Sequence, residues 1–319
     1  MADYKKYQSD GVSAEDKALD KFAELMIEKI ESLKNSDSWK QPWFTEGSLR
    51  WPRNLSGREY NGMNALLLMM LCEKQNYKLP VFCTFNRAVG LNYTTDKQGA
   101  KKPITDADGQ PLPRVGINKG EKSFPVMLTT FTVVDKDTKE KINYEDYKRL
   151  SNDEKAQYNV YPKLNVYQVF NVDQTNLKEA RPDLYAKLES ENKLQRPFSG
   201  EGESFKFPAM DAMIAENKWI CPINLVHQDN AYFSISKNQI TLPEKSQFKD
   251  GESFYGTAFH EMTHSTGTAE MFNRFNPESG FGSAEYAKEE LVAELGSALV
   301  AQRYGMTKNL TVSYTHLRA

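Results

Sequence analysis

The chain has 319 residues, of which 39% are hydrophobic and 26% are charged, with a formal net charge of −2. This composition excludes a membrane bundle, a coiled coil and a wholly disordered chain, and a chain of this length can bury a core without disulfides. The longest apolar run, residues 65–72, is too short to span a bilayer, and the first residues contain no apolar signal segment. Cys72, Cys83 and Cys221 form no CxxC pair. We therefore expect a cytoplasmic protein without membrane association.

The charge is distributed unevenly along the chain. Residues 1–165 have a net charge of +3, and residues 166–319 have a net charge of −5. Within the first part, residues 50–122 contain 12 basic and 6 acidic residues. A basic segment can attract a polyanion such as nucleic acid, although a solvated surface is the simpler explanation of so modest a surplus.

The sequence of the amino-terminal half predicts a domain of mixed helices and strands over residues 1–172. Apolar residues at three- and four-residue steps predict a helix over residues 14–35, and a second helix begins near Asn61 after an arginine-bearing loop. Residues 115–134 predict a hairpin, because the turn GINKGEK precedes a run rich in β-branched residues. Alternation and composition predict a strand over residues 164–172.

The carboxy-terminal half predicts a second domain over residues 206–310, joined to the first by a polar linker over residues 173–205. The expected elements are helical residues 207–217, a hairpin or two short strands over residues 231–242, and helices over residues 254–265 and 283–304. The fold class that follows is α+β with two domains.

One motif in this second domain indicates metal chemistry. Residues 260–264 read HEMTH, and on a helix His260 and His264 lie on the same face. Two imidazoles in this arrangement can hold one tetrahedral zinc ion, and Glu261 is positioned to act as general base. The alternative is coincidence, although the chain has only four histidines. His227 lies outside the motif and is interpreted as an ordinary loop histidine.

The third zinc ligand is expected on the following helix. Residues 290–294, ELVAE, are similar to the ExxA[DN] helix that supplies it in several HExxH peptidases, called gluzincins. This resemblance implies that Glu290 binds the metal and that Glu294 orients a ligating histidine. Tyr286 shares the same helical stripe and is a candidate for oxyanion stabilisation. Glu289 lies about 100° away around the helix, so we expect its replacement to change metal binding little; the alternative makes Glu294 the ligand and Glu290 its support.

The residues 231–242 precede the HExxH helix and have two interpretations. In zincins, an edge strand beside that helix holds the substrate backbone by β-augmentation. A plain sheet core explains this segment equally well.

Both halves together resemble the ArdC antirestriction proteins of plasmids and mobile elements. The resemblance rests on REYNGMNALLLMML, VGINKGEKSFPVMLTTFTVV and LNVYQVFNVDQ in the first half, and on FYGTAFHEMTHSTG and FGSAEYAKEELVAELGSALV in the second. It implies an amino-terminal domain that binds single-stranded DNA and a zincin-like metallopeptidase domain with one Zn²⁺ or another divalent metal per chain. The implied role is protection of incoming DNA during conjugation.

Binding of unpaired DNA requires cations along a groove and aromatic faces on which bases stack. The candidates are Trp39, Lys40, Trp43, Arg50, Trp51, Arg53, Arg58, Tyr60, Lys119 and Lys122. The alternative is that these aromatic residues belong to the core and lie beside surface cations.

The last nine residues, 311–319, read TVSYTHLRA, which looks like the translation of a transposase mosaic-end sequencing adapter. We therefore interpret them as a non-native tail and assign no function to His316. The alternative is an ordinary polar tail.

The resulting hypothesis is a single-stranded-DNA-binding antirestriction protein that carries a zinc peptidase with an unknown protein substrate. Two alternatives remain open. One is a DNA-binding shield with a structural metal and no proteolysis, and the other is a regulatory metalloprotease that cleaves a repressor.

Overall fold

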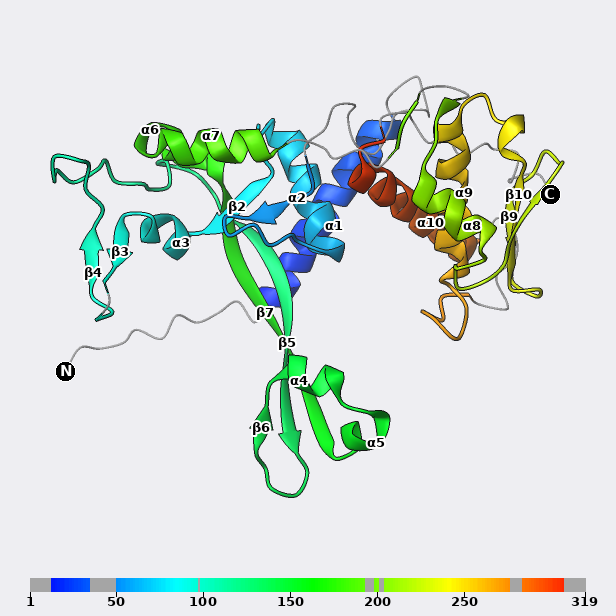
Figure 1. Cartoon of the computed structure of the whole chain (residues 1–319), viewed down its shortest axis with the longest axis horizontal. Coiled ribbons are helices and arrows are strands. Elements are labelled where there is room, and N and C mark those ends of the chain that lie inside the picture. The colour runs from blue at the N-terminus through cyan, green and yellow to red at the C-terminus, as the bar shows by residue number, and fades with distance from the viewer. Residues whose placement is uncertain are drawn as a thin grey trace. The chain divides into compact units, whose positions relative to one another are not determined.

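The computed structural model describes residues 13–34, 50–96, 98–192, 198–200, 204–275 and 283–306. It combines helices and sheets, as predicted, and divides into two compact units (Figure 1). The first unit includes Arg53–Leu67 and Val81–Leu188, and the second includes Leu68–Pro80 and the described residues from Glu189 onward.

The first unit is built on a five-stranded sheet with the order β1-β2-β7-β5-β6. The strands are β1 (Arg53–Asn54), β2 (Val81–Thr84), β5 (Phe124–Asp135), β6 (Lys141–Ile142) and β7 (Tyr158–Asn171). Only β1 and β2 are parallel, and the other neighbours are antiparallel. The buried residues Phe82, Val133 and Val169 belong to the core beside this sheet.

The predicted hairpin over residues 115–134 is wrong, and the predicted strand over residues 164–172 is confirmed as part of a longer one. The turn at Asn118 precedes β5 but does not join it to a strand on the other side, because Ile117 forms only an isolated bridge with Thr175. Instead, β5 pairs along its whole length with β7, from Phe124 opposite Val169 to Asp135 opposite Tyr158. The partner of β5 is thus reached only after a long connection.

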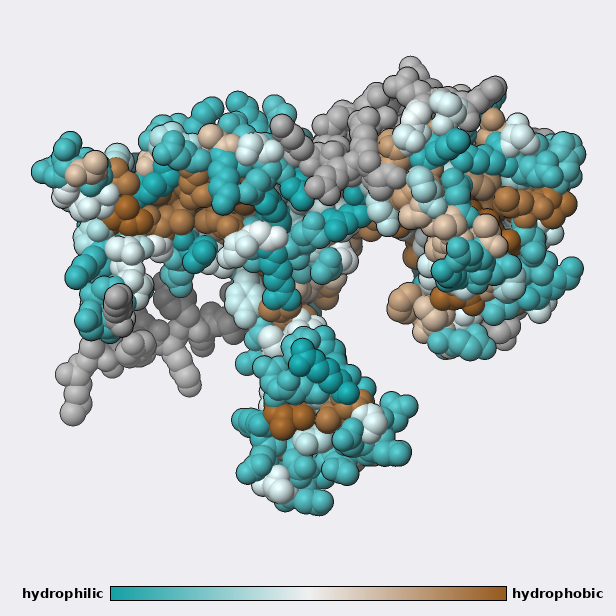
Figure 2. Space-filling model, viewed as in Figure 1, coloured by the Kyte–Doolittle hydropathy of each residue, from teal (hydrophilic) through white to brown (hydrophobic). Residues whose placement is uncertain are grey.

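That connection and the two long strands form a projection, here called the arm, which comprises residues 124–171. At its far end β6 is followed by α4 (Tyr144–Arg149) and α5 (Asn152–Lys155) (Figure 1). Phe131 stacks on Tyr144 with ring centroids 4.2 Å apart, and Tyr144 stacks in turn on Tyr147 at 6.0 Å. The arm is hydrophilic over most of its surface in Figure 2, with a band of hydrophobic residues near its end.

The helices predicted in the first half are confirmed. They are α1 (Ala14–Lys34) and α2 (Gly62–Gln75), and the apolar run of residues 65–72 is buried within α2. The remaining elements of this half are short: α3 (Phe85–Gly90), β3 (Tyr93–Thr95) and β4 (Lys101–Pro103). The side chain of Asn64 bonds the free edge of β5, because its amide accepts from Met127 N at 2.8 Å and donates to Met127 O at 2.5 Å.

The predicted linker over residues 173–205 is in part folded onto the first unit. It contains the 3₁₀ turn η1 (Val172–Gln174), α6 (Leu177–Ala180) and α7 (Pro182–Glu191). Leu177, Tyr185 and Leu188 are buried, and the Tyr185 hydroxyl donates to Asp173 at 2.7 Å. The polar composition concealed a thin apolar stripe, and the first compact unit includes these residues up to Leu188.

The second unit places helices beside a three-stranded sheet of order β8-β10-β9. Its elements are α8 (Pro208–Ala215), β8 (Ile223–Val226), β9 (Tyr232–Ser234), β10 (Gln239–Pro243), η3 (Lys245–Gln247), α9 (Gly251–Ser265) and α10 (Ala284–Tyr304). The predicted hairpin of residues 231–242 is confirmed as β9 and β10, which pair antiparallel, whereas β8 pairs parallel with β10. Ile240 and Leu242 pack in one buried cluster with Phe254 and Phe259 of α9.

Among the described residues, no helix is both long and apolar enough to cross a membrane.

Candidate metal centre

The HExxH motif lies in α9, and the sequence explains why a helix forms there. Asp250 caps the amino terminus by accepting from Ser253 N at 2.8 Å, and Phe254, Ala258 and Phe259 bury the apolar face of the helix. This packing also buries His260 and Glu261, which are 4% and 3% exposed. The motif is therefore held in the interior of the second unit.

A close crossing of α10 over α9 brings the third predicted ligand, Glu290, to these histidines. At the crossing, a Cβ atom on Gly296 of α10 would lie 2.5 Å from the Thr263 Cγ2 atom of α9. Glycine allows this approach of the two helices, because a larger residue at position 296 would require the Thr263 side chain to move. The predicted metal ligands consequently converge: donor atoms of His260, His264 and Glu290 all lie within 4.8 Å of one another.

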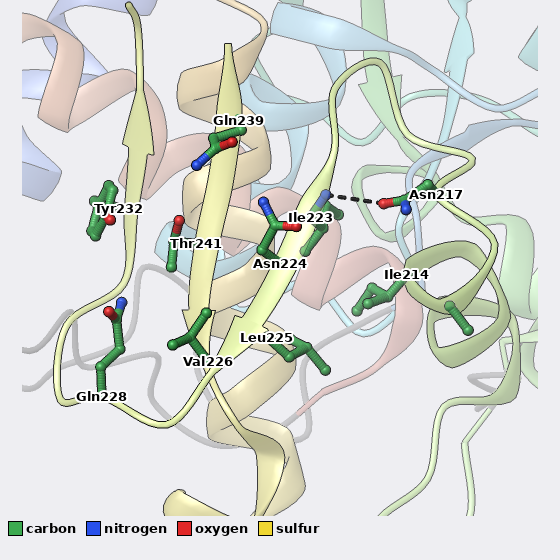
Figure 3. A pocket seen from close by; sticks show the side chains of 11 residues that line it. Ile214, Asn217, Ile223, Asn224, Leu225, Val226, Gln228, Tyr232, Gln239 and Thr241 are labelled. Atoms are coloured by element: carbon green, nitrogen blue, oxygen red, sulfur yellow. Dashed lines mark hydrogen bonds between the residues drawn. The ribbon is translucent and has the colours of Figure 1, made fainter. Parts of the chain in front are cut away.

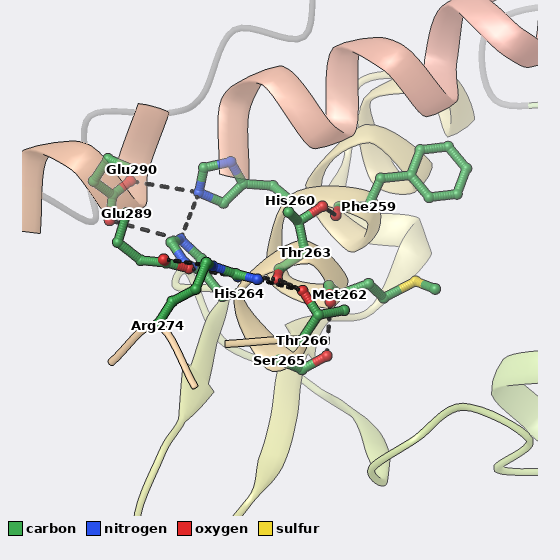
Figure 4. Close-up of polar contacts among 10 residues, drawn as sticks. All are labelled: Phe259, His260, Met262, Thr263, His264, Ser265, Thr266, Arg274, Glu289 and Glu290. Carbon is green, nitrogen blue, oxygen red and sulfur yellow. Dashed lines mark hydrogen bonds and ion pairs between the residues drawn. The ribbon is translucent and has the colours of Figure 1, made fainter. Parts of the chain in front are cut away.

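The donor atoms of these three side chains face one point (Figure 4). The two histidine Nε2 atoms are 3.1 Å apart, and the Glu290 carboxylate oxygens lie 3.5 Å from Nε2 of His260 and 3.6 Å from Nε2 of His264. Zinc bonds of about 2.1 Å in a tetrahedral site imply donor separations of about 3.4 Å. The three separations fit that geometry, and two imidazoles with one carboxylate are a donor set that suits a divalent metal.

Glu289, whose replacement was expected to change metal binding little, contacts Nδ1 of His264, one of the predicted metal ligands. Its Oε1 atom lies 3.2 Å from His264 Nδ1, and Arg274 donates to the same carboxylate (Figure 4). Burial opposes ionisation of Glu289, but the hydrogen bonds from His264 and Arg274 outweigh it and hold its pKa below the usual value. This contact argues against the expectation for Glu289, since a carboxylate so placed orients a ligating histidine.

The side chain of Glu294, which was expected to orient a ligating histidine, makes no hydrogen bond in the described part of the chain. Burial raises the pKa of its carboxyl group, the His260 charge opposes this rise, and the Glu290 charge adds to it. The Nδ1 atom of His260 is buried and has no hydrogen-bond partner among the described residues. Glu294 is thus close enough to His260 for an electrostatic effect but does not hold its ring.

Glu261 is positioned by α9 and by the neighbouring strand β9. The backbone N–H of Phe233 in β9 donates to its carboxylate. Burial raises the pKa of Glu261 to about 7; the His264 charge lowers it, and the Glu290 charge raises it. A carboxyl group with a pKa in this range is suited to proton transfer near neutral pH.

Tyr286 lies one turn before Glu290 on α10 and is half-buried. Its hydroxyl donates to the Glu290 carboxylate, which lowers the pKa of Glu290 against the opposing effect of burial. Burial raises the pKa of Tyr286 well above its usual value, and the hydrogen bond to Glu290 adds to the rise. Tyr286 thus stays protonated beside the three predicted ligands, as a hydrogen-bond donor must.

The aromatic candidates for DNA contact in the described residues are not free stacking faces. Tyr60 packs edge-on against Phe82 with ring centroids 6.3 Å apart, and burial raises its pKa to about 12. The guanidinium of Arg303 lies 5.3 Å from the ring centroid of Trp51. Trp39 and Trp43, together with Lys40, lie outside the described residues.

The basic candidates divide into two groups. Arg50 donates to the backbone carbonyl of Glu191, and Arg53 is half-buried in β1. Arg58, Lys119 and Lys122 are exposed, so they remain available to contact a phosphate.

The arm carries an exposed aromatic face that is not among the candidates chosen from the sequence. Tyr161, Lys163 and Tyr167 alternate along β7 and therefore point to one face, with Leu128 of β5 beside them. Tyr161, Tyr167 and Leu128 are 55%, 44% and 40% exposed. The signal was present in the run YPKLNVY, whose tyrosines and lysine fall at even spacings within a strand.

A hollow of the second unit lies on the opposite side of the three-stranded sheet from α9 (Figure 3). Its volume is about 630 Å³, and Asn224, Gln239 and Thr241 line it from the strands. No histidine, cysteine, aspartate or glutamate is among its lining residues. His227 is exposed, with Nδ1 3.5 Å from a carboxylate oxygen of Glu244, and thus lies outside the predicted metal cluster.

Comparison with known proteins assigns a family domain to each half. Residues 16–170 match the N-terminal domain of the anti-restriction factor ArdC, and residues 208–317 match a zincin-like metallopeptidase.

Two curated relatives from Escherichia coli, both named DNA primase TraC, align over most of the chain. One is 30% identical over 295 residues, which are 89% of this chain and 17% of that protein. The other is 25% identical over 290 residues, which are 90% of this chain and 23% of that protein. The chain thus spans about a fifth of the length of these relatives.

Two solved structures share the fold. They are the antirestriction ArdC protein of plasmid R388 in a metal-free form, with a TM-score of 0.55 and 21% identity, and in a Mn(II)-bound form, with a TM-score of 0.56 and 20% identity. Each match covers 93% of this chain and 86% of the solved chain. With an ArdC amino-terminal domain followed by a zincin-like metallopeptidase domain, the chain is an ArdC-like protein.

Proposed function

We propose that the second unit is a zinc-dependent peptidase in which His260, His264 and Glu290 hold one divalent cation and Glu261 is the general base. The observation that supports it is the convergence of the three donors beside a buried carboxyl group. A bound zinc ion supplies Lewis acidity at this point. Glu261 accepts a proton from the attacking water, and Tyr286 donates to the oxyanion that develops at the peptide carbonyl. The protein substrate is a polypeptide not yet identified.

Metal content tests this site directly. Purified wild-type protein is expected to hold about one zinc ion per chain, and His264→Ala is expected to lose it, because a tetrahedral site does not retain zinc on two protein ligands. Native mass spectrometry of both proteins after zinc loading and desalting measures the stoichiometry. Equal metal in the two proteins would show that the assignment of His264 is wrong.

We further propose that the first unit binds single-stranded DNA without strong sequence preference, through the face of the arm that carries Tyr161, Lys163 and Tyr167. Exposed aromatic rings with an intervening cation meet the two requirements for unpaired bases and their phosphates. The names of the similar proteins, an antirestriction factor and DNA primases, support a role on DNA. The biological role we propose is protection of incoming DNA during conjugation, in the cytoplasm of the recipient.

Substitutions on the arm test the DNA proposal in the full-length protein. Tyr161→Ala and Tyr167→Ala are each expected to weaken binding of a fluorescent thymidine oligonucleotide by roughly tenfold, because stacking contributes about 1–3 kcal/mol per base. Lys163→Ala is expected to reduce the slope of log affinity against log salt by about one charge. Fluorescence anisotropy over a salt series measures both effects.

The matched control is Tyr93→Ala, which removes a tyrosine that is 37% exposed on β3, away from the arm. Equal losses at Tyr93 and at the arm tyrosines would place the DNA elsewhere. More effective competition by a duplex than by a single strand would contradict the preference for unpaired bases.

A further inference from the structure

A chain of three polar side chains leads away from the metal centre. His264 Nδ1 lies 3.2 Å from Glu289 Oε1. Arg274 grips the same carboxylate with two nitrogens, since Nη2 donates to Oε1 and Nε donates to Oε2, each at 2.9 Å. This bidentate geometry fixes the carboxylate in position as well as in charge.

Arg274 is itself anchored to the end of α9. Its Nη2 also donates to the backbone carbonyl of Thr263 at 2.9 Å, and its Nη1 donates to Thr266 Oγ1 at 3.0 Å. The backbone N–H of Arg274 bonds the carbonyl of Gly267 at 2.9 Å. One guanidinium therefore ties the last turn of the motif helix to the carboxylate on α10.

These groups are shielded from water, which strengthens their interaction. The side chains of His264 and Glu289 are each 13% exposed, and that of Arg274 is 22% exposed. Charges at such sites are screened less than surface charges. The ion pair therefore holds the Glu289 carboxylate against the His264 ring.

The contact determines which nitrogen of His264 bears the proton. A carboxylate at Nδ1 accepts the Nδ1–H bond, which leaves the lone pair on Nε2, the atom that faces His260 and Glu290. It also raises the basicity of Nε2. His260 lacks such support among the described residues, because its Nδ1 atom has no partner there. Of the two histidines, only His264 has a polar partner at Nδ1 in the described part of the chain.

We propose that Glu289 and Arg274 are positioning residues for the metal centre: Glu289 holds the Nδ1–H bond of His264, and Arg274 fixes Glu289 by bridging it to the end of α9. This inference rests on the proposed function, because it assumes that His264 is a metal ligand.

The test measures zinc affinity of the full chain by competition with a chromophoric chelator. Glu289→Ala is expected to weaken binding by roughly ten- to a hundredfold, as the loss of a carboxylate behind a ligating histidine does. Glu289→Gln keeps an oxygen that accepts from Nδ1–H but loses the charge, so a smaller loss is expected. Arg274→Lys keeps the charge but not the bidentate grip, and a loss of several-fold is expected.

The control is Glu285→Gln, which removes an exposed acid from the first turn of the same helix and is expected to bind zinc as the wild type does. Cobalt(II) loading adds a second measurement, the visible absorption of the bound metal. This absorption should not change in the variants if Glu289 and Arg274 only stabilise the fold. The visible absorption band of bound cobalt is expected to shift in Glu289→Gln and in Arg274→Lys, because the imidazole of His264 changes its orientation and basicity.

The possible results distinguish failure of the roles given to Glu289 and Arg274 from failure of the proposed zinc site. Zinc affinity and cobalt spectra that match the wild type in all three variants would overturn the inference and leave the metal site intact. A wild type that binds no zinc would overturn the proposed function and, with it, the inference. Apoprotein melting curves identify a variant that loses affinity by unfolding, and in that case the milder Glu289→Gln and Arg274→Lys variants decide the result.

Discussion

Replacement of Glu261 by glutamine is expected to abolish peptide hydrolysis while leaving zinc affinity close to that of the wild type. Glutamine preserves the size of the side chain and can still accept from the Phe233 N–H, but it cannot take a proton from water. Loss of a general base lowers the rate by about 10²- to 10⁴-fold. Glu261 is not among the three converging donors, so the metal should remain bound.

Cleavage of a mixed peptide library, followed by mass spectrometry, measures hydrolysis even though the natural substrate is unidentified. The matched control is Glu270→Gln, which makes the same chemical change at an exposed acid shortly after α9. A Glu261→Gln variant that cleaves as fast as the control would remove Glu261 from the mechanism. A wild type that binds zinc and DNA but cleaves nothing would favour the alternative of a DNA-binding shield with a structural metal.

The sequence predicted best those elements whose signal is local. The periodicity of residues 14–35 and the apolar run of residues 65–72 both appear as helices, and the motif helix begins three residues earlier than expected. The partner of β5 could not be found in this way. Its turn is a local signal for a hairpin, but pairing with β7 is decided by packing across the sheet. The apolar stripe of α7 was also missed, because the average composition of that segment is polar.

The metal centre shows where helical geometry alone is insufficient. The i and i+4 spacing places His260 and His264 together, and Glu290, expected beside them, is a neighbour of both. The same helical geometry predicted that Glu289 has little effect on metal binding, because a rotation of about 100° separates Glu289 from Glu290. The close crossing at Gly296 brings two faces of α10 to the site, so that Glu290 faces the Nε2 atoms and Glu289 reaches Nδ1 of His264. The spacing of residues in the sequence did not indicate Arg274, because Arg274 lies in a loop that folds back onto the end of α9.

The DNA candidates show a different limit of sequence reasoning. Clustering of aromatic and basic residues does not distinguish an exposed ring from one that packs against the core, and the half-buried Tyr60 packs against Phe82. The exposed tyrosines of the arm became visible only with the pairing of β5 and β7, which fixes the face that each side chain occupies.

Glu290 and Glu294 share a stripe of α10, but their replacement is expected to affect zinc binding differently. Glu290→Ala is expected to remove most of the bound zinc, because its carboxylate lies within 3.6 Å of both Nε2 atoms and no other acid joins them in the described cluster. Glu294→Ala is expected to weaken zinc binding by less than about tenfold, the lower limit for losing a contact that orients a ligand, because Glu294 bonds neither histidine in the described residues.

Chelator competition on the two purified variants measures the difference, and Glu285→Ala on the same helix is the control for loss of a charge. If Glu294→Ala loses more zinc than Glu290→Ala, the roles of the two acids are reversed and the later turn of α10 supplies the ligand. Equal and small losses would mean that the two histidines hold the metal with a donor from elsewhere, because a carboxylate that completes a tetrahedral site cannot be removed without a large loss of affinity.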